Sequence, residues 1–265
     1  MDFTAFFKAL TEFLPFMPKI YNEVIIAPGD LVMVFFWFLA AVASFYFSLG
    51  NARLWTSISI GFFLIFWSQG YLLNPYASSY FRVTAVHNII GAVSILLISH
   101  GFQEYFVFTR TLEITGSKRA IYITTAVAIL VGIIVVYMNP KPSLFTLRNY
   151  RMMENSIWTF LSLVNIYVIV NIWREMRDSP IANGILSFAA VFFFILMWKS
   201  SELYLQIYQF DPTWQMLVEE YDLGIKSFGL DDTLVQIAQK LNSLGGLFAG
   251  ISVGGTFAYL FKLLR

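Results

Sequence analysis

The chain has 265 residues, of which 58% are hydrophobic and only 12% are charged. This charged share is about half that of a typical soluble domain. The formal net charge of +1 leaves no excess of basic residues to neutralise a phosphate backbone, so nucleic-acid binding is not expected. The absence of cysteine excludes disulfides, thiolate metal sites and Cys-ligated clusters.

Apolar stretches dominate the chain from residue 31 to its end. Each approaches or matches the roughly 20 residues that a helix needs to cross a hydrocarbon core about 30 Å thick. The pattern predicts an all-α polytopic membrane protein with about seven transmembrane helices, built as one membrane-embedded bundle over residues 1–265. The predicted spans are Leu31–Leu49, Leu54–Leu73, Val83–Ser99, Ala120–Met138, Ile157–Trp173, Ile181–Trp198 and Leu244–Leu264.

Residues 1–25 have the pattern of an amphipathic helix. Aromatic and aliphatic side chains such as Phe3, Phe7 and Leu10 recur at helical spacing, and Pro15 and Pro18 end the pattern. We expect this helix to lie in the membrane interface with its aromatic face toward lipid. Docking on the bundle or on a neighbouring subunit is the alternative.

The distribution of charge predicts the orientation of the bundle. On the side that carries the C-terminus, Lys and Arg outnumber Asp and Glu, and they lie in short loops or short tails. On the side that carries the N-terminus, acidic residues are in excess. Because positive residues in short loops mark the cytoplasmic side, we expect the N-terminus outside and the C-terminus inside. Residues 139–155 form a predicted connection on the outer side. A predicted connection of about 20 residues, ending with Thr109–Arg119, lies on the inner side.

Residues 199–243 form a long polar stretch before the last span, which we expect to be helical and extracytoplasmic. Asp211 and Pro212 are suited to begin one helix, and a carboxylate at Asp231 or Asp232 is suited to cap a second. The apolar spacing from Leu234 onward continues into the last span without a proline. We therefore expect one continuous helix over about 231–264, about 50 Å long.

Two histidines, His87 and His100, flank the third predicted span. They are 13 residues apart, a rotation of about 220° around a helix, so they point to roughly opposite faces. One helix therefore cannot supply both axial ligands of a haem. We expect no haem, metal or other cofactor, although a quinone or a lipid is compatible with the sequence.

Polar residues gather toward the outer side of several spans. Gln69, His87, Asn88, Lys199 and Glu202 are candidate ligand-binding residues, and Arg148, Arg151 and Glu154 belong to the same level. Intramembrane polar groups are costly and usually face a cavity or a partner, so they are suited to line an outward-facing vestibule for an ion, a quinone or a small polar ligand. The alternative is that Lys199 extends to the interface and that Lys199 and Glu202, three residues apart, neutralise each other.

The last span carries Gly246, Gly250 and Gly254 at four-residue spacing, which we call the glycine ridge. Small residues at this spacing allow close backbone approach of another helix. That helix belongs either to the chain itself or to a second chain, and the sequence leaves both open.

Asn165 lies in the middle of the fifth predicted span. An amide at mid-bilayer is usually satisfied by a neighbouring helix. No transport role is indicated by this residue alone.

The sequence has no P-loop, no G-x-S-x-G and no H-E-x-x-H motif, and no paired intramembrane carboxylates suited to metal or proton-pump chemistry. We therefore expect a non-catalytic subunit that anchors or organises a larger membrane complex, with the lipid bilayer and other membrane subunits, or further copies of itself, as partners. The alternatives are a seven-helix sensor or ligand-binding protein and a transporter or channel for ions or small solutes. The expected location is the cell membrane, which in a bacterium is the inner membrane.

Overall fold

The computed structural model describes residues 28–50, 54–70, 81–111, 118–138, 143–208 and 232–263. In these parts of the chain it is all-helical, with seven helices and no strand. The helices are α2 (Pro28–Gly50), α3 (Leu54–Gly70), α4 (Phe81–Thr111), α5 (Lys118–Met138), α6 (Leu144–Glu175), α7 (Ala182–Ile207) and α9 (Asp232–Leu263). The amphipathic helix predicted over 1–25 and the helix predicted to begin at Asp211 lie outside the described residues.

Six of these helices, all except α3, are long and apolar enough to cross a membrane. The described part of each predicted span falls on a single helix, so the prediction of a polytopic helical membrane protein agrees with the fold. Helix α3 has 17 residues, about 25 Å at 1.5 Å per residue. The continuous helix predicted over 231–264 is confirmed by α9, whose 32 residues run unbroken from Asp232 to Leu263.

Two predicted connections are wrong, because helices continue well beyond the apolar stretches. Helix α6 begins at Leu144, where Ser143 accepts a hydrogen bond from the Thr146 amide as its N-cap, so most of the predicted 139–155 loop is helical. Helix α4 continues past Ser99 to Thr111, which shortens the inner connection that includes Thr109–Arg119. A hydropathy pattern detects only the continuously apolar part of a helix, and these extensions contain charged and amide residues at intervals.

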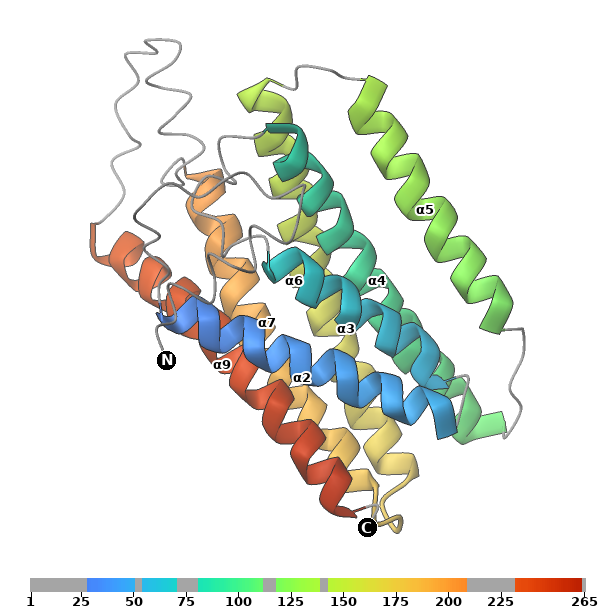
Figure 1. Ribbon diagram of the computed structural model, residues 1–265. Coiled ribbons are helices and arrows are strands. Elements are labelled where there is room, and N and C mark those ends of the chain that lie inside the picture. The colour runs from blue at the N-terminus through green and yellow to red at the C-terminus, as the bar shows by residue number, and fades with distance from the viewer. Residues whose placement is uncertain are drawn as a thin grey trace, which may run out of the picture.

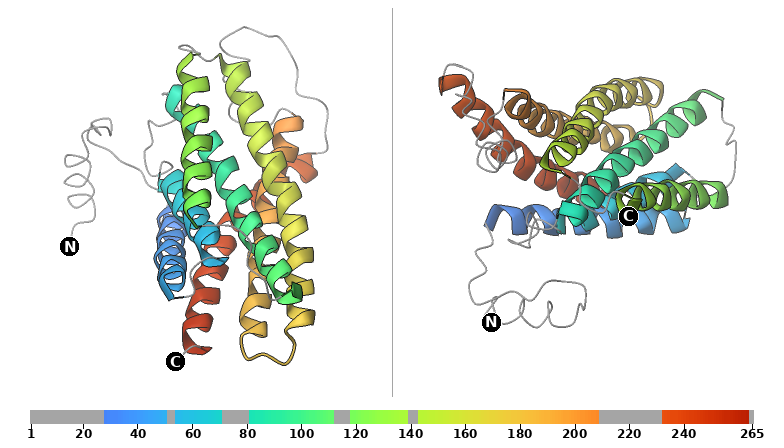
Figure 2. Two further views of the ribbon diagram at one scale, coloured as in Figure 1. Left: turned by 90° about the vertical axis from the view of Figure 1, so that its right-hand side faces the viewer. Right: turned by 90° about the horizontal axis from the view of Figure 1, so that it is seen from above.

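The helices other than α5 form a closed ring in which each one packs on two neighbours, in the order α2, α3, α4, α6, α7, α9 and back to α2 (Figures 1 and 2). The interior of the ring is filled largely by aromatic side chains. Phe188 on α7 lies at its centre, with ring centroids 5.2 Å from Phe102, 5.4 Å from Phe257 and 6.4 Å from Phe62. Together with Trp37 these rings belong to the largest fully buried side chains of the described residues.

Helix α5 stands at the edge of the ring (Figure 1) and packs mainly on α4. Only 17% of its apolar span is buried, against 33–50% for the other candidate spans. The main close approach is at Gly132, where an added Cβ would clash with Ile89 of α4. Most of the α5 surface therefore faces the surroundings of the protein, which fits contact with the lipid bilayer.

The glycine ridge lies against the chain's own helices. A Cβ added at Gly250 would lie 3.2 Å from Met33 Cα, and one added at Gly246 would lie 3.3 Å from the Trp198 ring, while Gly254 faces the Phe36 ring. The ridge thus serves the packing of α9 against α2 and α7. The sequence left open whether the glycine ridge packs against the chain itself or against a second chain. The contacts that the structure describes are with the chain's own helices.

Candidate functional site

Helices α6 and α7 form an antiparallel hairpin that brings a set of charged and amide side chains together. The turn between them is closed by main-chain hydrogen bonds from Ser179 to Met176 and from Ala182 to Ser179. The start of α6 therefore lies beside the end of α7. On α6, Arg151, Glu154 and Asn155 project from one face, and on α7, Lys199, Glu202 and Gln206 recur at three- and four-residue spacing. We call these six residues the ionic cluster.

Lys199 is the centre of the ionic cluster. Its Nζ donates to Asn155 Oδ1 at 3.1 Å and lies 3.5 Å from both Glu154 Oε1 and Glu202 Oε2. The same ammonium lies 4.5 Å from the centroid of the Trp198 ring and 5.6 Å from that of Trp158. These contacts satisfy all three donors of the ammonium and add two aromatic faces that attract a cation.

A second cation extends the ionic cluster toward the ends of the two helices. Arg151 donates through Nε to Glu202 Oε1 at 2.9 Å, and its Nη2 lies 2.7 Å from the same oxygen. Glu202 therefore bridges two cations, with one carboxylate oxygen on Arg151 and the other on Lys199. One turn further along, Arg148 donates to the main-chain oxygen of Gln206 at 2.7 Å.

The amides of the ionic cluster form an ordered chain of hydrogen bonds. Asn155 Oδ1 accepts from Lys199, so its Nδ2 is the donor that reaches Gln206 Oε1 at 3.1 Å. This in turn assigns the two polar ends of Gln206, because the end that accepts must be the oxygen. Gln206 Nε2 is then a donor that has no hydrogen-bond partner within the described residues.

Most of the ionic cluster is buried within the protein, and Arg151 is its partly exposed member. Lys199 is 5% exposed and Glu154 is 3% exposed, so the ammonium does not extend outward to reach water. Removing charges from water costs several kcal/mol per ion, which good pairing only partly offsets. Ionisable groups inside a membrane bundle are therefore functional candidates by default.

Helices α3 and α4 contribute neutral polar groups to the same end of the bundle. His87 Nδ1 lies 3.0 Å from Ser68 Oγ, and Gln69 and Asn88 are both buried. Gln69 Oε1 and Asn88 Nδ2 have no hydrogen-bond partner within the described residues.

Gly91 is the point at which α4 meets the ionic cluster. Trp158 Nε1 donates to Gly91 O at 3.0 Å. The Glu154 carboxylate lies so close to Gly91 that any Cβ there would clash with it. A side chain at this position would displace the end of the Glu154 side chain, and the approach brings the α3–α4 polar groups and the ionic cluster to one level of the bundle.

The five predicted ligand-binding residues thus lie at one end of the bundle, but in two groups. Lys199 and Glu202 are joined directly, and Gln69 and Asn88 flank the Ser68–His87 contact in sequence. The sequence-based set did not include Asn155 and Gln206. Gln206 lies four residues after Glu202 on the same helix. The predicted span ended at Trp198, so the sequence did not indicate that Gln206 and Lys199 share a helix face.

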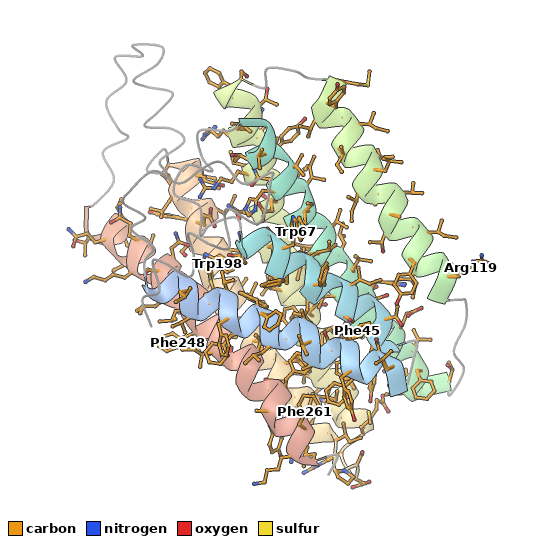
Figure 3. The ribbon with its side chains drawn as sticks, in the orientation of Figure 1. Phe45, Trp67, Arg119, Trp198, Phe248 and Phe261 are labelled. Atoms are coloured by element: carbon orange, nitrogen blue, oxygen red, sulfur yellow. The ribbon has the colours of Figure 1, made fainter. Side chains whose placement is uncertain are left out.

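The second histidine lies away from this site. His100 Nε2 is 3.6 Å from Glu104 Oε1 on the same helix, and its side chain is half exposed. Among the described residues no three His, Cys, Asp or Glu side chains lie close enough together to hold a metal ion. In Figure 3, Trp198, which is next to Lys199 on α7, lies above Phe261, which is near the C-terminal end of α9.

No protein-family model, curated protein or solved structure matches this chain. Its function is therefore inferred from the site alone.

Proposed function

We propose that the chain is a membrane protein that binds a small polar ligand at the ionic cluster. The observation that carries this proposal is Lys199, buried with two carboxylates and an amide where α6, α7 and α4 meet. A purely structural clamp between α6 and α7 would need no buried charges, because apolar residues pack membrane helices without the desolvation cost. The buried atoms Gln69 Oε1, Asn88 Nδ2 and Gln206 Nε2, which have no partner among the described residues, support binding at the same level.

A ligand that binds the folded protein raises its stability by about 2.7 kcal/mol at 100 times Kd. The test is thermal unfolding of the purified protein in lipid nanodiscs, followed by tryptophan fluorescence, with a panel of small cationic, neutral and anionic compounds. We expect one class to stabilise the wild type and to have no effect on Lys199→Met. Arg110→Met is the matched control, because Arg110 pairs with Glu175 at 3.3 Å on the exposed surface, and it should keep the response. A wild type that responds to no class, or a response that persists in Lys199→Met, contradicts the proposal.

The proposed orientation places the ionic cluster toward the outside of the cell membrane. Support comes from the cationic residues at the opposite end, among them Arg110, Arg119, Arg174 and Arg177, which are all exposed. If α3 is counted as a seventh crossing, the two termini lie on opposite sides, and the cationic end then favours the N-terminus outside and the C-terminus inside. In this cysteine-free chain, Cys at position 117 or 179 should resist an impermeant thiol reagent in intact cells, and Cys at position 227 should react. The reverse pattern contradicts this orientation.

A second candidate function is that of a non-catalytic subunit of a larger membrane complex or homo-oligomer. The weakly packed α5 supports it, because this helix exposes apolar side chains such as Val127 and Leu130 around most of its surface. The glycine ridge no longer supports it, because the ridge packs inside the chain. A photo-crosslinker at Leu130 should give a discrete protein adduct in membranes, and one at Phe160 on α6, which is also exposed, serves as the comparison. Lipid adducts alone at Leu130 contradict this second function.

A further inference from the structure

The orientation of the Gln206 amide indicates the kind of group that the site recognises. Lys199 donates to Asn155, Asn155 donates to Gln206 Oε1, and Gln206 Nε2 stands at the end of this chain as a donor. Each hydrogen bond polarises the next, so the ammonium at the start strengthens the donor at the end. Gln206 is 0% exposed, and no acceptor for Nε2 lies within the described residues.

The electrostatic surroundings of Gln206 favour a negatively charged acceptor over a neutral one. The guanidinium of Arg148 donates to the main-chain oxygen of the same residue at 2.7 Å. Both carboxylates of the ionic cluster are held by cations, Glu202 by Arg151 and Lys199, and Glu154 by Lys199. A cationic ligand would therefore meet Gln206 Nε2 as a competing donor, whereas an anionic oxygen would accept from it and gain from the nearby positive charge.

We propose that the ligand carries a carboxylate group, and that Gln206 Nε2 is the donor that recognises one of its oxygens. This inference rests on the proposed function and adds the chemical class of the ligand. Gln206 is in this account a specificity-determining residue, because its donor end distinguishes a carboxylate from an isosteric amide. The ionic pairs of Lys199 serve to hold Asn155 and Gln206 in the orientation that presents this donor.

The experiment compares pairs of nearly isosteric probes. Acetate, butyrate and hexanoate are titrated against acetamide, butyramide and hexanamide on the full chain in nanodiscs. Binding is followed by tryptophan fluorescence, because Trp158 and Trp198 contact Lys199, and by thermal unfolding. We expect at least one carboxylate to bind about tenfold or more tightly than its amide, since a hydrogen bond to a charged group is worth more than a neutral one.

Two substitutions at Gln206 test the role of its donor. Gln206→Glu replaces the donor by a carboxylate but keeps a side-chain oxygen that can accept from Asn155, and the main-chain oxygen that accepts from Arg148 is unchanged. It should fold and lose carboxylate binding by about tenfold or more. Gln206→Met keeps the volume without either polar end and should reduce the preference for carboxylate over amide to near unity. Gln103→Glu, the same change at an exposed position of α4, should bind as the wild type does.

The outcomes separate the ligand class from the proposed function. An amine or a neutral compound that stabilises the wild type and depends on Lys199, with no carboxylate binding, overturns the carboxylate assignment and leaves the function standing. A carboxylate that binds the wild type and Gln206→Glu equally overturns the role of Gln206. A wild type that binds no compound of any class overturns both the assignment and the function on which it rests.

Discussion

The glycine ridge and the ionic cluster hold helices together by opposite means. At the ridge, α9 approaches the backbone of α2 closely because side chains are missing, as at Gly250 beside Met33. At the ionic cluster, α6 and α7 are joined by long charged side chains, of which Glu154, Lys199 and Glu202 are buried. The first contact has no polar group to satisfy, so it is explained by packing alone. The second contact carries a desolvation cost that packing does not require, and for this reason we assign function to the ionic cluster and structure to the ridge.

The largest expected effect is that of Lys199→Met. The change removes the only cation within reach of Glu154 among the described ion pairs and one of the two cations that hold Glu202. Breaking a buried pair on one side costs about 3–5 kcal/mol. Thermal unfolding in nanodiscs measures it, with Arg110→Met as the exposed comparison at about 0–1 kcal/mol. Equal stabilities of the two variants would mean that the cluster is not buried in the membrane protein.

Gly250→Leu tests the other side of the comparison. A Cβ at this position already lies within 3.2 Å of the Met33 backbone, so a leucine forces α9 away from α2. Overpacking of this kind costs about 1–3 kcal/mol. Gly255→Leu, where nothing lies within 4 Å of an added Cβ, is the matched control. Unfolding and expression of the isolated protein should be impaired in the first variant alone. A stable Gly250→Leu that has only lost an association with other chains would place the ridge in an interface between subunits.

A smaller effect is expected for Gly91→Ala. Gly91 combines both kinds of contact, because it is a glycine at a close approach between helices and it lies against Glu154 of the ionic cluster. The new methyl group collides with the end of the Glu154 side chain and moves this carboxylate away from Lys199. Weakening one charged hydrogen bond should cost about 1–2 kcal/mol. The tryptophan spectrum should change as well, because the ammonium lies over the rings of Trp158 and Trp198. Gly255→Ala should alter neither quantity, and an unaltered Gly91→Ala would show that α4 is not in contact with the ionic cluster.

The smallest effect is expected at mid-bundle. Asn165 Nδ2 donates to Ser99 Oγ of α4 at 2.9 Å, as the sequence predicted for an amide at that depth. Interhelical hydrogen bonds in membranes average about 0.6 kcal/mol, and Asn165→Leu should lose about that much stability. Asn171→Leu is the control, because among the described residues Asn171 donates to the carbonyl of Tyr167 on its own helix. A loss of stability above about 2 kcal/mol in Asn165→Leu would contradict this prediction. It would show that an uncharged polar contact stabilises the bundle as strongly as a charged one.

The sequence predicted the helical membrane class and the apolar part of every described helix, because the apolar length of a span is a local property, but it missed the extensions of α4 and α6. It also identified Lys199 and Glu202 as a pair, since their spacing of three residues is visible along one helix. The remaining contacts depend on the register between α6 and α7, which pairs residues 44 to 58 positions apart. Asn155 and Gln206 were missed for this reason. The aromatic interior around Phe188 was missed too, because rings that face lipid and rings that face the core have the same hydropathy.

The central claim is that the end of the bundle around Lys199 holds a ligand. It is tested most directly by an experimental density map of the protein in nanodiscs formed from its own membrane, without a detergent step that removes bound molecules. We predict density that belongs to no protein atom within hydrogen-bonding distance of Gln206 Nε2. A map in which Gln206 Nε2 donates to a protein group, and in which α4, α6 and α7 close around Lys199 without such density, would contradict the claim.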